Sequence, residues 1–420
     1  MNIEISAAQL DGHLAVPASK SELHRALIVA LLTPQTTRIE AHGISDDVHV
    51  TVGCLKALGA RVNFTGGAIE VTGPDSFPQS AVLDCKESGS TLRFFLPLVA
   101  ALGITATFKM AESLYARPHQ PLLDQLTQHG CAVSTQTGEI NVSDQLLSGT
   151  YTLPSDVSSQ YISGLLMALP LLYGQSVIEL DGPLESYGYV NMTLDALEQA
   201  NIDIEEAELS FTIPGNQTYF SPSIARIGGD WSAAAFWLVA DALGANVHLT
   251  NLDEASYQPD AGIRFIFERF GTRVVEHGET YALHERLDEA IIDVSQTPDL
   301  APALAVLAAF AQGQTSFINA ARLRLKESDR IASICAMLTA CGVEVHEEKD
   351  GFAVYGPASL KGGMVDAHGD HRIAMAAAIL GSFSAEPLVI TGAECVAKSY
   401  PDFFDDLARM GGKSHVTVEG

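Results

Sequence analysis

Residues 297–313 read TPDLAPALAVLAAFAQG, a nearly continuous apolar run that begins beside a proline and a carboxylate and ends at a glycine. A helix that is apolar on every side is normally buried inside a domain. The longest uninterrupted apolar part, residues 301–311, is too short to cross a bilayer. The stretch therefore predicts a helix in the core of a globular domain, and we expect no membrane partner.

The same arrangement recurs six times along the chain. Each copy has a small or charged polar start, an apolar helical run, a glycine-containing turn, a β-branched strand, a polar stretch and a second amphipathic helix. The copies begin at or near Ser19, Ser88, Ser158, Asp230, Thr297 and Gly369. Their start-to-start separations lie between 67 and 72 residues, so a period near 70 accounts for essentially the whole sequence.

The repeats also predict the domain organisation. A chain of 420 residues exceeds what a single hydrophobic core usually holds. Three copies per domain give an α/β protein with two similar domains. We expect repeats one to three in residues 19–227, and repeats four to six in residues 228–420 together with 1–18, with the boundary near two glycines in ARIGG.

The composition restricts the partners. The chain carries 24 Lys and Arg against 51 Asp and Glu, a formal net charge of −27, so most of its surface would repel a nucleic acid. An anionic partner must therefore be small and held in a locally positive pocket.

The six cysteines are scattered without a CxxC motif, which indicates buried thiols in a reducing compartment. The first residues do not resemble a targeting segment, and we expect a cytoplasmic protein.

Basic residues gather at the predicted helix starts. Lys20 and Arg25 are five residues apart in the first copy, and Arg93 and Arg372 occupy similar places in the second and sixth. A positive charge at a helix N-terminus opposes the helix dipole and needs a compensating anion. Isolated charges of this kind are usually solvated and polar helix starts are usually ordinary caps, but the recurrence favours a shared anion site.

A second group of basic residues precedes the second helix of several copies. It contains Arg117, Lys398 and the stretch RLRLKESDRI, residues 322–331. Asp299 and Glu327 accompany these cations. A carboxylate at a helix start is often only a cap, yet beside phosphate-binding cations it can accept or donate a proton. Asp299 and Glu327 are therefore candidate acid–base groups.

One short motif contains residue types that bind metals. HGDHR, residues 368–372, includes His368, Asp370 and His371. Arg372 beside them would oppose a cation, and no other His, Asp or Cys cluster matches this one in the sequence. We expect no metal site.

Taken together, the motifs resemble the enolpyruvyl transferase family over nearly the full chain. SKSELHRAL resembles the family pattern SKS..NRAL, and the other carriers are ESGSTLRF, ARPHQPLLDQL, SSQYISGLLMALP, PDLAPALA, RLKESDRI, GDHRIAMA and AKSYPDFFDDL. The resemblance implies two inside-out α/β domains, each of three repeats around buried parallel helices. It also implies transfer of the enolpyruvyl group of phosphoenolpyruvate to the 5-hydroxyl of shikimate 3-phosphate, with release of phosphate, in the shikimate pathway of aromatic amino acid biosynthesis.

The resemblance further implies two sets of binding residues. Those implied to bind shikimate 3-phosphate are Lys20, Ser21, Arg25, Ser158, Ser159, Gln160, Ser186, Asp299, Arg322 and Lys326. Those implied to bind phosphoenolpyruvate are Lys20, Gly89, Arg117, Gln160, Arg330, Arg372 and Lys398. Guanidinium groups suit both carboxylate and phosphate, and a glycine permits close backbone approach.

Three residues are implied to be catalytic. Asp299 is similar to the group that accepts the proton of the attacking hydroxyl, Glu327 to the acid that protonates the methylene carbon, and Lys20 to a cation that reaches phosphoenolpyruvate. Fixed cations stabilise the developing charge, so no cofactor is expected. The chain departs from the family pattern at Glu87 and Arg322, where many members have Asn; as a hypothesis, Arg322 strengthens phosphate binding.

Two alternatives remain open. A related enzyme class transfers the enolpyruvyl group to UDP-N-acetylglucosamine and uses a loop Cys shortly before its ARP motif, whereas MAESLYARP has Glu112 at that place. A non-catalytic, clamp-like repeat protein would also be acidic and repetitive, but it would not need cations at buried helix starts. We expect the chain to be a monomer.

Overall fold

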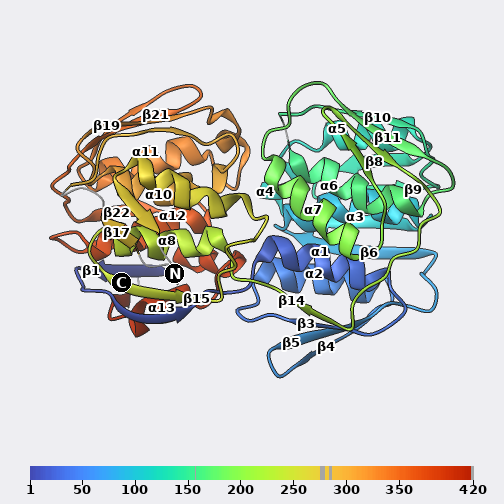
Figure 1. The fold of residues 1–420 in the computed structure, drawn as a ribbon, viewed down its shortest axis with the longest axis horizontal. Coiled ribbons are helices and arrows are strands. Elements are labelled where there is room, and N and C mark those ends of the chain that lie inside the picture. Colours follow the sequence, from blue (N-terminus) through green and yellow to red (C-terminus); the bar gives the residue numbers. More distant parts are fainter. Residues whose placement is uncertain (157, 275–279, 283–285, 418–420) are drawn as a thin grey trace. The chain divides into compact units, whose positions relative to one another are not determined.

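The computed structural model describes residues 1–156, 158–274, 280–282 and 286–417. The chain divides into two compact units (Figure 1). Unit 1 comprises Met1–Ala18, Gly43–Ser45 and Gly228–Gly420, and unit 2 comprises Ser19–His42 and Asp46–Ile227. Each unit is α/β, with helices packed against small sheets.

Among its described residues, unit 2 contains three four-stranded sheets that share one strand order. In each sheet the first two strands are parallel and the remaining neighbours are antiparallel. The first sheet runs β14 (Ile224–Arg226), β3 (Thr37–Glu40), β5 (Ala68–Thr72), β4 (Arg61–Thr65). The second runs β6 (Ser80–Lys86), β7 (Thr105–Met110), β9 (Glu139–Ser143), β8 (Ala132–Gln136). The third runs β10 (Thr150–Leu153), β11 (Ser176–Leu180), β13 (Ser210–Ile213), β12 (Glu205–Ala207).

The helices of unit 2 divide into buried and outer ones. The buried helices are α1 (Lys20–Leu31), α3 (Gly89–Ala101) and α6 (Ser159–Ala168). The others are α2 (Asp46–Ala57), α4 (Glu112–Tyr115), α5 (Gln120–Gln128), α7 (Tyr187–Gln199) and the 3-10 turn η1 (Leu169–Leu171). A serine side chain accepts a backbone N–H at the start of each buried helix, which is the usual role of an N-cap.

A glycine lets two of the buried helices approach closely. Pro97 in α3 has no N–H, so the Arg93 carbonyl one turn earlier lacks its ordinary helical donor. Gly164 of α6 lies against this carbonyl, and a Cβ atom at Gly164 would be 2.4 Å from the oxygen. A side chain at position 164 would therefore force α3 and α6 apart.

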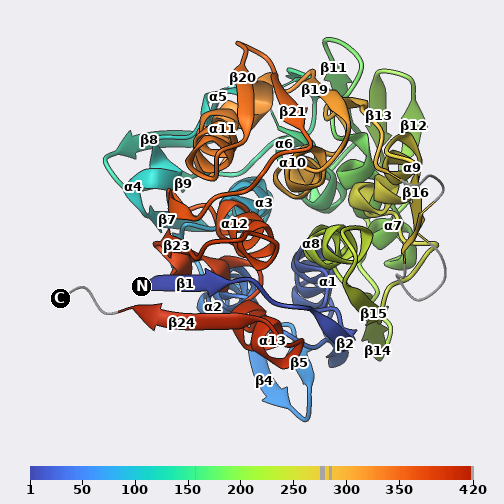
Figure 2. The same cartoon turned by 90° about the vertical axis from the view of Figure 1, so that its left-hand side faces the viewer.

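The described residues of unit 1 form two four-stranded sheets with the same order of one parallel pair and two antiparallel neighbours. One runs β18 (Ile291–Asp293), β19 (Gly313–Ile318), β21 (Phe352–Gly356), β20 (Glu344–Glu347). The other runs β22 (Gly363–Asp366), β23 (Leu388–Thr391), β1 (Asn2–Ser6), β24 (Lys413–Thr417), and Figure 2 shows β1 beside β24. Two further strand pairs lie in the described part of the unit: β15 (Asn246–Thr250) parallel to β2 (Asp11–Ala15), and β16 (Thr272–Val274) antiparallel to β17 (Thr280–Ala282).

Three buried helices of unit 1 pack against one another: α8 (Trp231–Ala242), α10 (Ala301–Ala308) and α12 (His371–Ser382). Every residue of α10 is buried, which confirms the helix predicted from the opening sequence. The remaining elements are α9 (Ile263–Arg269), α11 (Arg330–Ala340), α13 (Phe403–Arg409), η2 (Pro259–Gly262), η4 (Pro298–Leu300), η5 (Ala321–Leu325) and η6 (Ala393–Lys398). The predicted period of about 70 residues stays a prediction.

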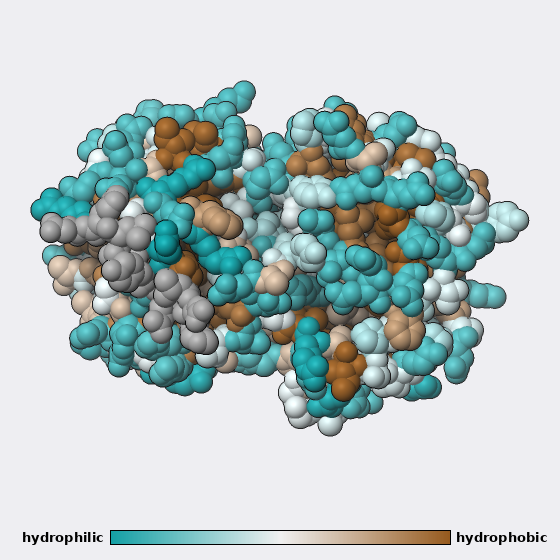
Figure 3. All heavy atoms as spheres, viewed as in Figure 1, coloured by the Kyte–Doolittle hydropathy of each residue, from teal (hydrophilic) through white to brown (hydrophobic). Residues whose placement is uncertain are grey.

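Hydrophilic side chains cover much of the face shown in Figure 3, with smaller hydrophobic patches between them. Among the described residues, no helix is long and apolar enough to cross a membrane.

Candidate active site

Acidic and basic side chains meet at helix starts in unit 1. Asp299 lies in η4 just before α10, Arg330 is the first residue of α11, and Arg372 lies in the first turn of α12. The helix starts come together because α10 packs against both α11 and α12. The acidic cluster members are Asp299, Glu327 and Asp370, and the basic members are Lys326, Arg330 and Arg372.

Asp299 contacts three cations at once. Its Oδ1 accepts a hydrogen bond from Arg330 Nη1 at 2.8 Å and lies 3.3 Å from Lys326 Nζ. Its Oδ2 accepts a hydrogen bond from Arg372 Nη2 at 3.0 Å. Burial alone would raise the pKa of Asp299, but the three cations hold that pKa well below its usual range. Asp299 is therefore ionised at neutral pH, the state in which a carboxylate can accept a proton.

Arg330 is the centre of the cluster. Its side chain is 0% exposed, and it donates from Nε to Asp370 Oδ2 at 2.8 Å and from Nη2 to Glu327 Oε2 at 2.6 Å. Burial would lower the pKa of Arg330, but Asp370, Glu327 and Asp299 raise it above its ordinary value. Asp370 is also the N-cap of α12, since it accepts the Arg372 backbone N–H at 3.0 Å. Arg330 thus stays charged. Its side chain joins Glu327, just before α11, to Asp370, at the start of α12.

A further buried carboxyl group, Asp260, lies in η2, and the charge of Asp299 acts on its pKa. Asp260 is 1% exposed, and its Oδ2 accepts a hydrogen bond from the Ser232 hydroxyl. Burial, followed by the negative charge of Asp299, raises the pKa of Asp260 to about 7, although Arg372 opposes the shift. Unlike Asp299, Asp260 can therefore hold a proton near neutral pH.

We expect Asp260 to make the protein less stable as the pH rises. The folded carboxyl keeps its proton up to about pH 7, whereas the unfolded one releases it near 3.8, so the folded state binds more protons in this window. The free energy of unfolding should then fall by about 2 to 3 kcal/mol from pH 5 to pH 7 on account of this group. Urea unfolding at several pH values should show that Asp260→Asn removes this contribution. An equal slope in the variant would contradict the assignment.

The other predicted residues of unit 1 lie in neighbouring turns. Lys326 directly follows η5, and its side chain is 25% exposed. Arg322 lies within η5, and Lys398 is the last residue of η6 and is buried. These three basic residues are thus held by 3-10 turns, whereas Arg330 and Arg372 belong to helices.

In unit 2, Lys20 is the first residue of α1. Its Nζ lies 3.1 Å from Asp47 Oδ2 in α2, and the two side chains are 14% and 9% exposed. Asp47 therefore partly compensates a cation that would otherwise oppose the dipole of α1.

Arg25 is more deeply buried than Lys20 and is held by the protein itself. It donates from Nε to the Thr193 hydroxyl at 2.8 Å and from Nη2 to the Tyr189 carbonyl at 2.6 Å. Nη1 donates to the Ser21 carbonyl at 2.6 Å, and the guanidinium lies 5.3 Å from the centre of the Phe94 ring. Burial lowers the pKa of Arg25 to about 10, so the group remains charged at neutral pH.

Gly89, the first residue of α3, lies beside two guanidinium groups. A Cβ atom there would be 3.4 Å from Arg93 Nη1 and 3.5 Å from Arg117 Nη1. Gln160 joins this group: its Oε1 accepts from Arg93 Nη1 at 2.7 Å, and its Nε2 donates to Ser90 Oγ at 2.9 Å. The start of α3 thus lies between two cations, an arrangement suited to a carboxylate or phosphate.

Besides Ser21 in α1, three predicted serines of unit 2 lie at helix starts. Ser158 is the N-cap of α6, and its Oγ accepts the Gln160 backbone N–H at 3.3 Å. Ser159 is the first residue of α6. Ser186 precedes α7 with a φ of 55°, a left-handed conformation that is uncommon for serine.

Four residues of these clusters were not predicted as site residues. Arg93 was noted only as a recurring cation, Asp370 only as one of the metal-binding residue types in HGDHR, where no metal site was expected, and Asp47 was not singled out. The position of these three residues at predicted helix starts was the signal that could have indicated them. Asp260 belongs to no recognised motif, and only the fold brings it near Asp299.

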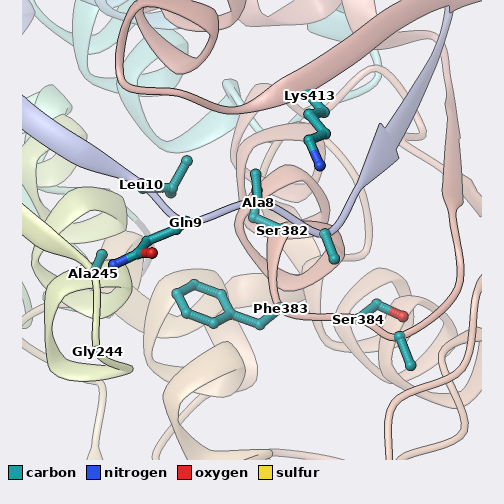
Figure 4. A pocket seen from close by; sticks show the side chains of 11 residues that line it. Ala8, Gln9, Leu10, Gly244, Ala245, Ser382, Phe383, Ser384 and Lys413 are labelled. Carbon is teal, nitrogen blue, oxygen red and sulfur yellow. The ribbon is translucent and has the colours of Figure 1, made fainter.

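Two further features of the described residues are informative. Among them, no three His, Cys, Asp or Glu side chains are grouped so that they could hold a metal ion. A hollow of about 570 Å³ in unit 1 is lined by Gln9, Phe383 and Lys413, among others (Figure 4). This hollow lies at the C-terminal ends of α8 and α12 and contains none of the predicted site residues.

The fold is that of the enolpyruvyl transferases. The structure of the EPSP synthase from Acinetobacter baumannii is similar, with a TM-score of 0.81 and 24% sequence identity over 99% of this chain and 100% of that one. The enolpyruvyl transferase NikO from Streptomyces tendae has a TM-score of 0.78 and 19% identity, over 99% of this chain and 98% of that one. These likenesses confirm the predicted two-domain α/β fold class.

Sequence similarity identifies a narrower family than the fold does. The sequence model of the EPSP synthase (3-phosphoshikimate 1-carboxyvinyltransferase) family matches residues 5–407, and the chain belongs to this family. The chain is 40% identical over 416 residues to the 3-phosphoshikimate 1-carboxyvinyltransferase of Clostridium kluyveri, covering 98% of this chain and 97% of that protein.

Proposed function

We propose that this protein transfers the enolpyruvyl group of phosphoenolpyruvate to the 5-hydroxyl of shikimate 3-phosphate and releases phosphate. The observation that supports it best is the pairing of Asp299 and Glu327 with Lys326, Arg330 and Arg372 at helix starts. Both substrates are anions, which gives these cations and those of unit 2 a compensating charge. Family membership supports the same reaction.

The proposed chemistry is an addition followed by an elimination. In the addition, the 5-hydroxyl oxygen bonds to C2 of phosphoenolpyruvate, its proton goes to Asp299, and Glu327 gives a proton to the methylene carbon. In the elimination, the proton flow reverses: the C2–O bond to phosphate breaks, Glu327 takes a proton back from the new methyl group as the double bond forms again, and Asp299 gives its proton to the leaving phosphate. The cations stabilise the negative charge that moves onto phosphate.

Substrate binding would also change the pKa of Asp299. Its pKa is held low by three cations, which makes it a weak base in the ligand-free protein. An anion that shares Lys326 or Arg372 would weaken their effect on Asp299 and raise its pKa towards the range useful for proton transfer. We propose that substrate binding itself makes Asp299 a stronger base.

The proposed binding residues remain those of the two predicted sets. In unit 1, Arg330, Arg372 and Lys398 would bind phosphoenolpyruvate, and Arg322 and Lys326 would bind the phosphate of shikimate 3-phosphate. The unit 2 residues proposed for the two substrates are Lys20, Ser21, Arg25, Gly89, Arg117, Ser158, Ser159, Gln160 and Ser186. We further propose that the chain acts as a cytoplasmic monomer, and light scattering of the purified protein would test the monomer.

The decisive experiment is an acceptor comparison. Phosphate release from phosphoenolpyruvate should occur with shikimate 3-phosphate and not with UDP-N-acetylglucosamine. Release with the nucleotide sugar alone would favour the alternative transferase. Release with neither acceptor would overturn the enzymatic proposal and favour a non-catalytic protein.

Gly89→Ala should raise the KM for phosphoenolpyruvate with little loss of stability. The added methyl would lie at ordinary contact distance, 3.4 Å and 3.5 Å, from Arg93 Nη1 and Arg117 Nη1, so the fold can accept it. The same methyl would occupy the space beside the two guanidinium groups that the proposal assigns to the substrate. Initial rates at varied phosphoenolpyruvate and a melting curve check both parts. An unchanged KM would show that Gly89 does not border this site.

A further inference from the structure

A buried chain of hydrogen bonds in unit 2 ends at the start of α3. His24 Nδ1 lies 2.7 Å from Thr51 Oγ1, Thr51 Oγ1 lies 2.7 Å from Thr91 Oγ1, and Thr91 Oγ1 lies 2.7 Å from Ser88 Oγ. His24 is 1% exposed, and the other three residues are 0% exposed. A continuous polar chain of this kind inside a core is costly unless its members satisfy one another.

The chain of hydrogen bonds connects α1 and α2 to the start of α3. His24 belongs to α1 and Thr51 to α2, while Ser88 is the N-cap of α3 and also accepts the Thr91 backbone N–H at 3.4 Å. Gly89 follows Ser88 directly. The hydroxyl groups therefore fix the first turn of α3 against α1 and α2.

The charge and the tautomer of His24 follow from its surroundings. Burial lowers the pKa of His24 to about 3, with Asp47 opposing the shift, so the ring is neutral at neutral pH. Nε2 is buried and has no hydrogen-bond partner among the described residues. In folded proteins a buried N–H group without an acceptor is rarer than a buried acceptor without a donor. Nε2 is therefore the unprotonated nitrogen, and the proton lies on Nδ1. His24 then donates to Thr51, which can donate to Thr91, which can donate to Ser88.

We infer that His24 is a positioning residue for phosphoenolpyruvate binding, acting through Thr51, Thr91 and Ser88 on the backbone at Gly89. The inference rests on the proposed function, because it takes Gly89 as part of the phosphoenolpyruvate site. His24 need not touch the substrate: the chain of hydroxyl groups holds the first turn of α3 in the position that binds it.

Thr51→Val tests the chain of hydrogen bonds, and Thr37→Val is the matched control variant. Valine has nearly the shape of threonine but cannot connect His24 to Thr91. The Thr37 hydroxyl donates to Ser221 at 2.8 Å, is equally buried and is not part of the chain. Thr51→Val removes both hydrogen bonds of the Thr51 hydroxyl, of which only the one to Thr91 reaches α3. It should raise the KM for phosphoenolpyruvate roughly threefold to tenfold, the net contribution of about one hydrogen bond, with kcat and the KM for shikimate 3-phosphate nearly unchanged. Thr37→Val should alter only stability.

His24 itself is tested by a conservative pair of variants. His24→Asn keeps an amide N–H near the place of Nδ1 and should retain most of the affinity for phosphoenolpyruvate. His24→Leu removes the donor at similar volume and should behave like Thr51→Val. Equal KM values for the two His24 variants, or for Thr51→Val and Thr37→Val, would overturn the inference.

A measurement without substrate separates this inference from the proposed function. Hydrogen exchange of the Ser90 and Thr91 amides should be faster in Thr51→Val than in wild type and unchanged in Thr37→Val. If wild type shows no turnover with either acceptor, the proposed function fails while this result still shows whether the chain holds α3. Unchanged exchange in Thr51→Val would overturn the positioning role even if the enzyme is active.

Discussion

Glu327→Gln should lower kcat for phosphate release by roughly 10²- to 10⁴-fold, the usual loss when a general acid is removed. Glutamine cannot give a proton to the methylene carbon. Stability should change much less, because a glutamine oxygen can still accept from Arg330, which also keeps Asp299 and Asp370 as partners. Steady-state rates and thermal unfolding of the same sample measure the two effects.

Asp329→Asn is a control from the same loop. Asp329 lies two residues after Glu327, pairs with Arg324 at 2.7 Å and is 43% exposed. It caps α11 by accepting the Ala332 N–H, and asparagine can keep that bond. The control should therefore retain near-normal turnover. Equal losses in both variants would mean that the loop structure, and not the carboxyl group of Glu327, supports the rate.

The sequence predicted the parts of the fold that depend on local signals. Ser19, Ser88 and Ser158 mark the starts of α1, α3 and α6 because a serine cap and the following apolar run are adjacent in the chain. The apolar composition of residues 301–308 was likewise sufficient to predict a buried α10. Fold class and motif positions could therefore be predicted without coordinates.

The partners within the candidate site could not be predicted in the same way. Arg330 and Asp370 are separated by 40 residues, and nothing local indicates that the Arg330 guanidinium will donate two hydrogen bonds to that carboxylate. The motif HGDHR was considered only for metal binding, which was not expected, so no site role was predicted for Asp370. Asp260 has no motif at all, and its raised pKa depends on burial and on Asp299, which only tertiary packing supplies.

Asp370→Ala should be strongly destabilising, by about 3 to 5 kcal/mol, because it leaves a buried guanidinium without its main partner. The Arg330 and Asp370 side chains are both 0% exposed and share bonds of 2.8 Å and 3.2 Å. The variant also loses the N-cap of α12, which adds about 1 kcal/mol. Urea unfolding at pH 7 gives the free energy directly.

Asp329→Ala separates the two contributions to that loss. It removes an N-cap from α11 and a partly exposed pair with Arg324, so it should cost only about 1 to 2 kcal/mol. The excess loss in Asp370→Ala then measures what the buried pairing with Arg330 contributes. If both variants lose the same stability, Arg330 is adequately held by Glu327 and Asp299, and Asp370 acts only as a helix cap.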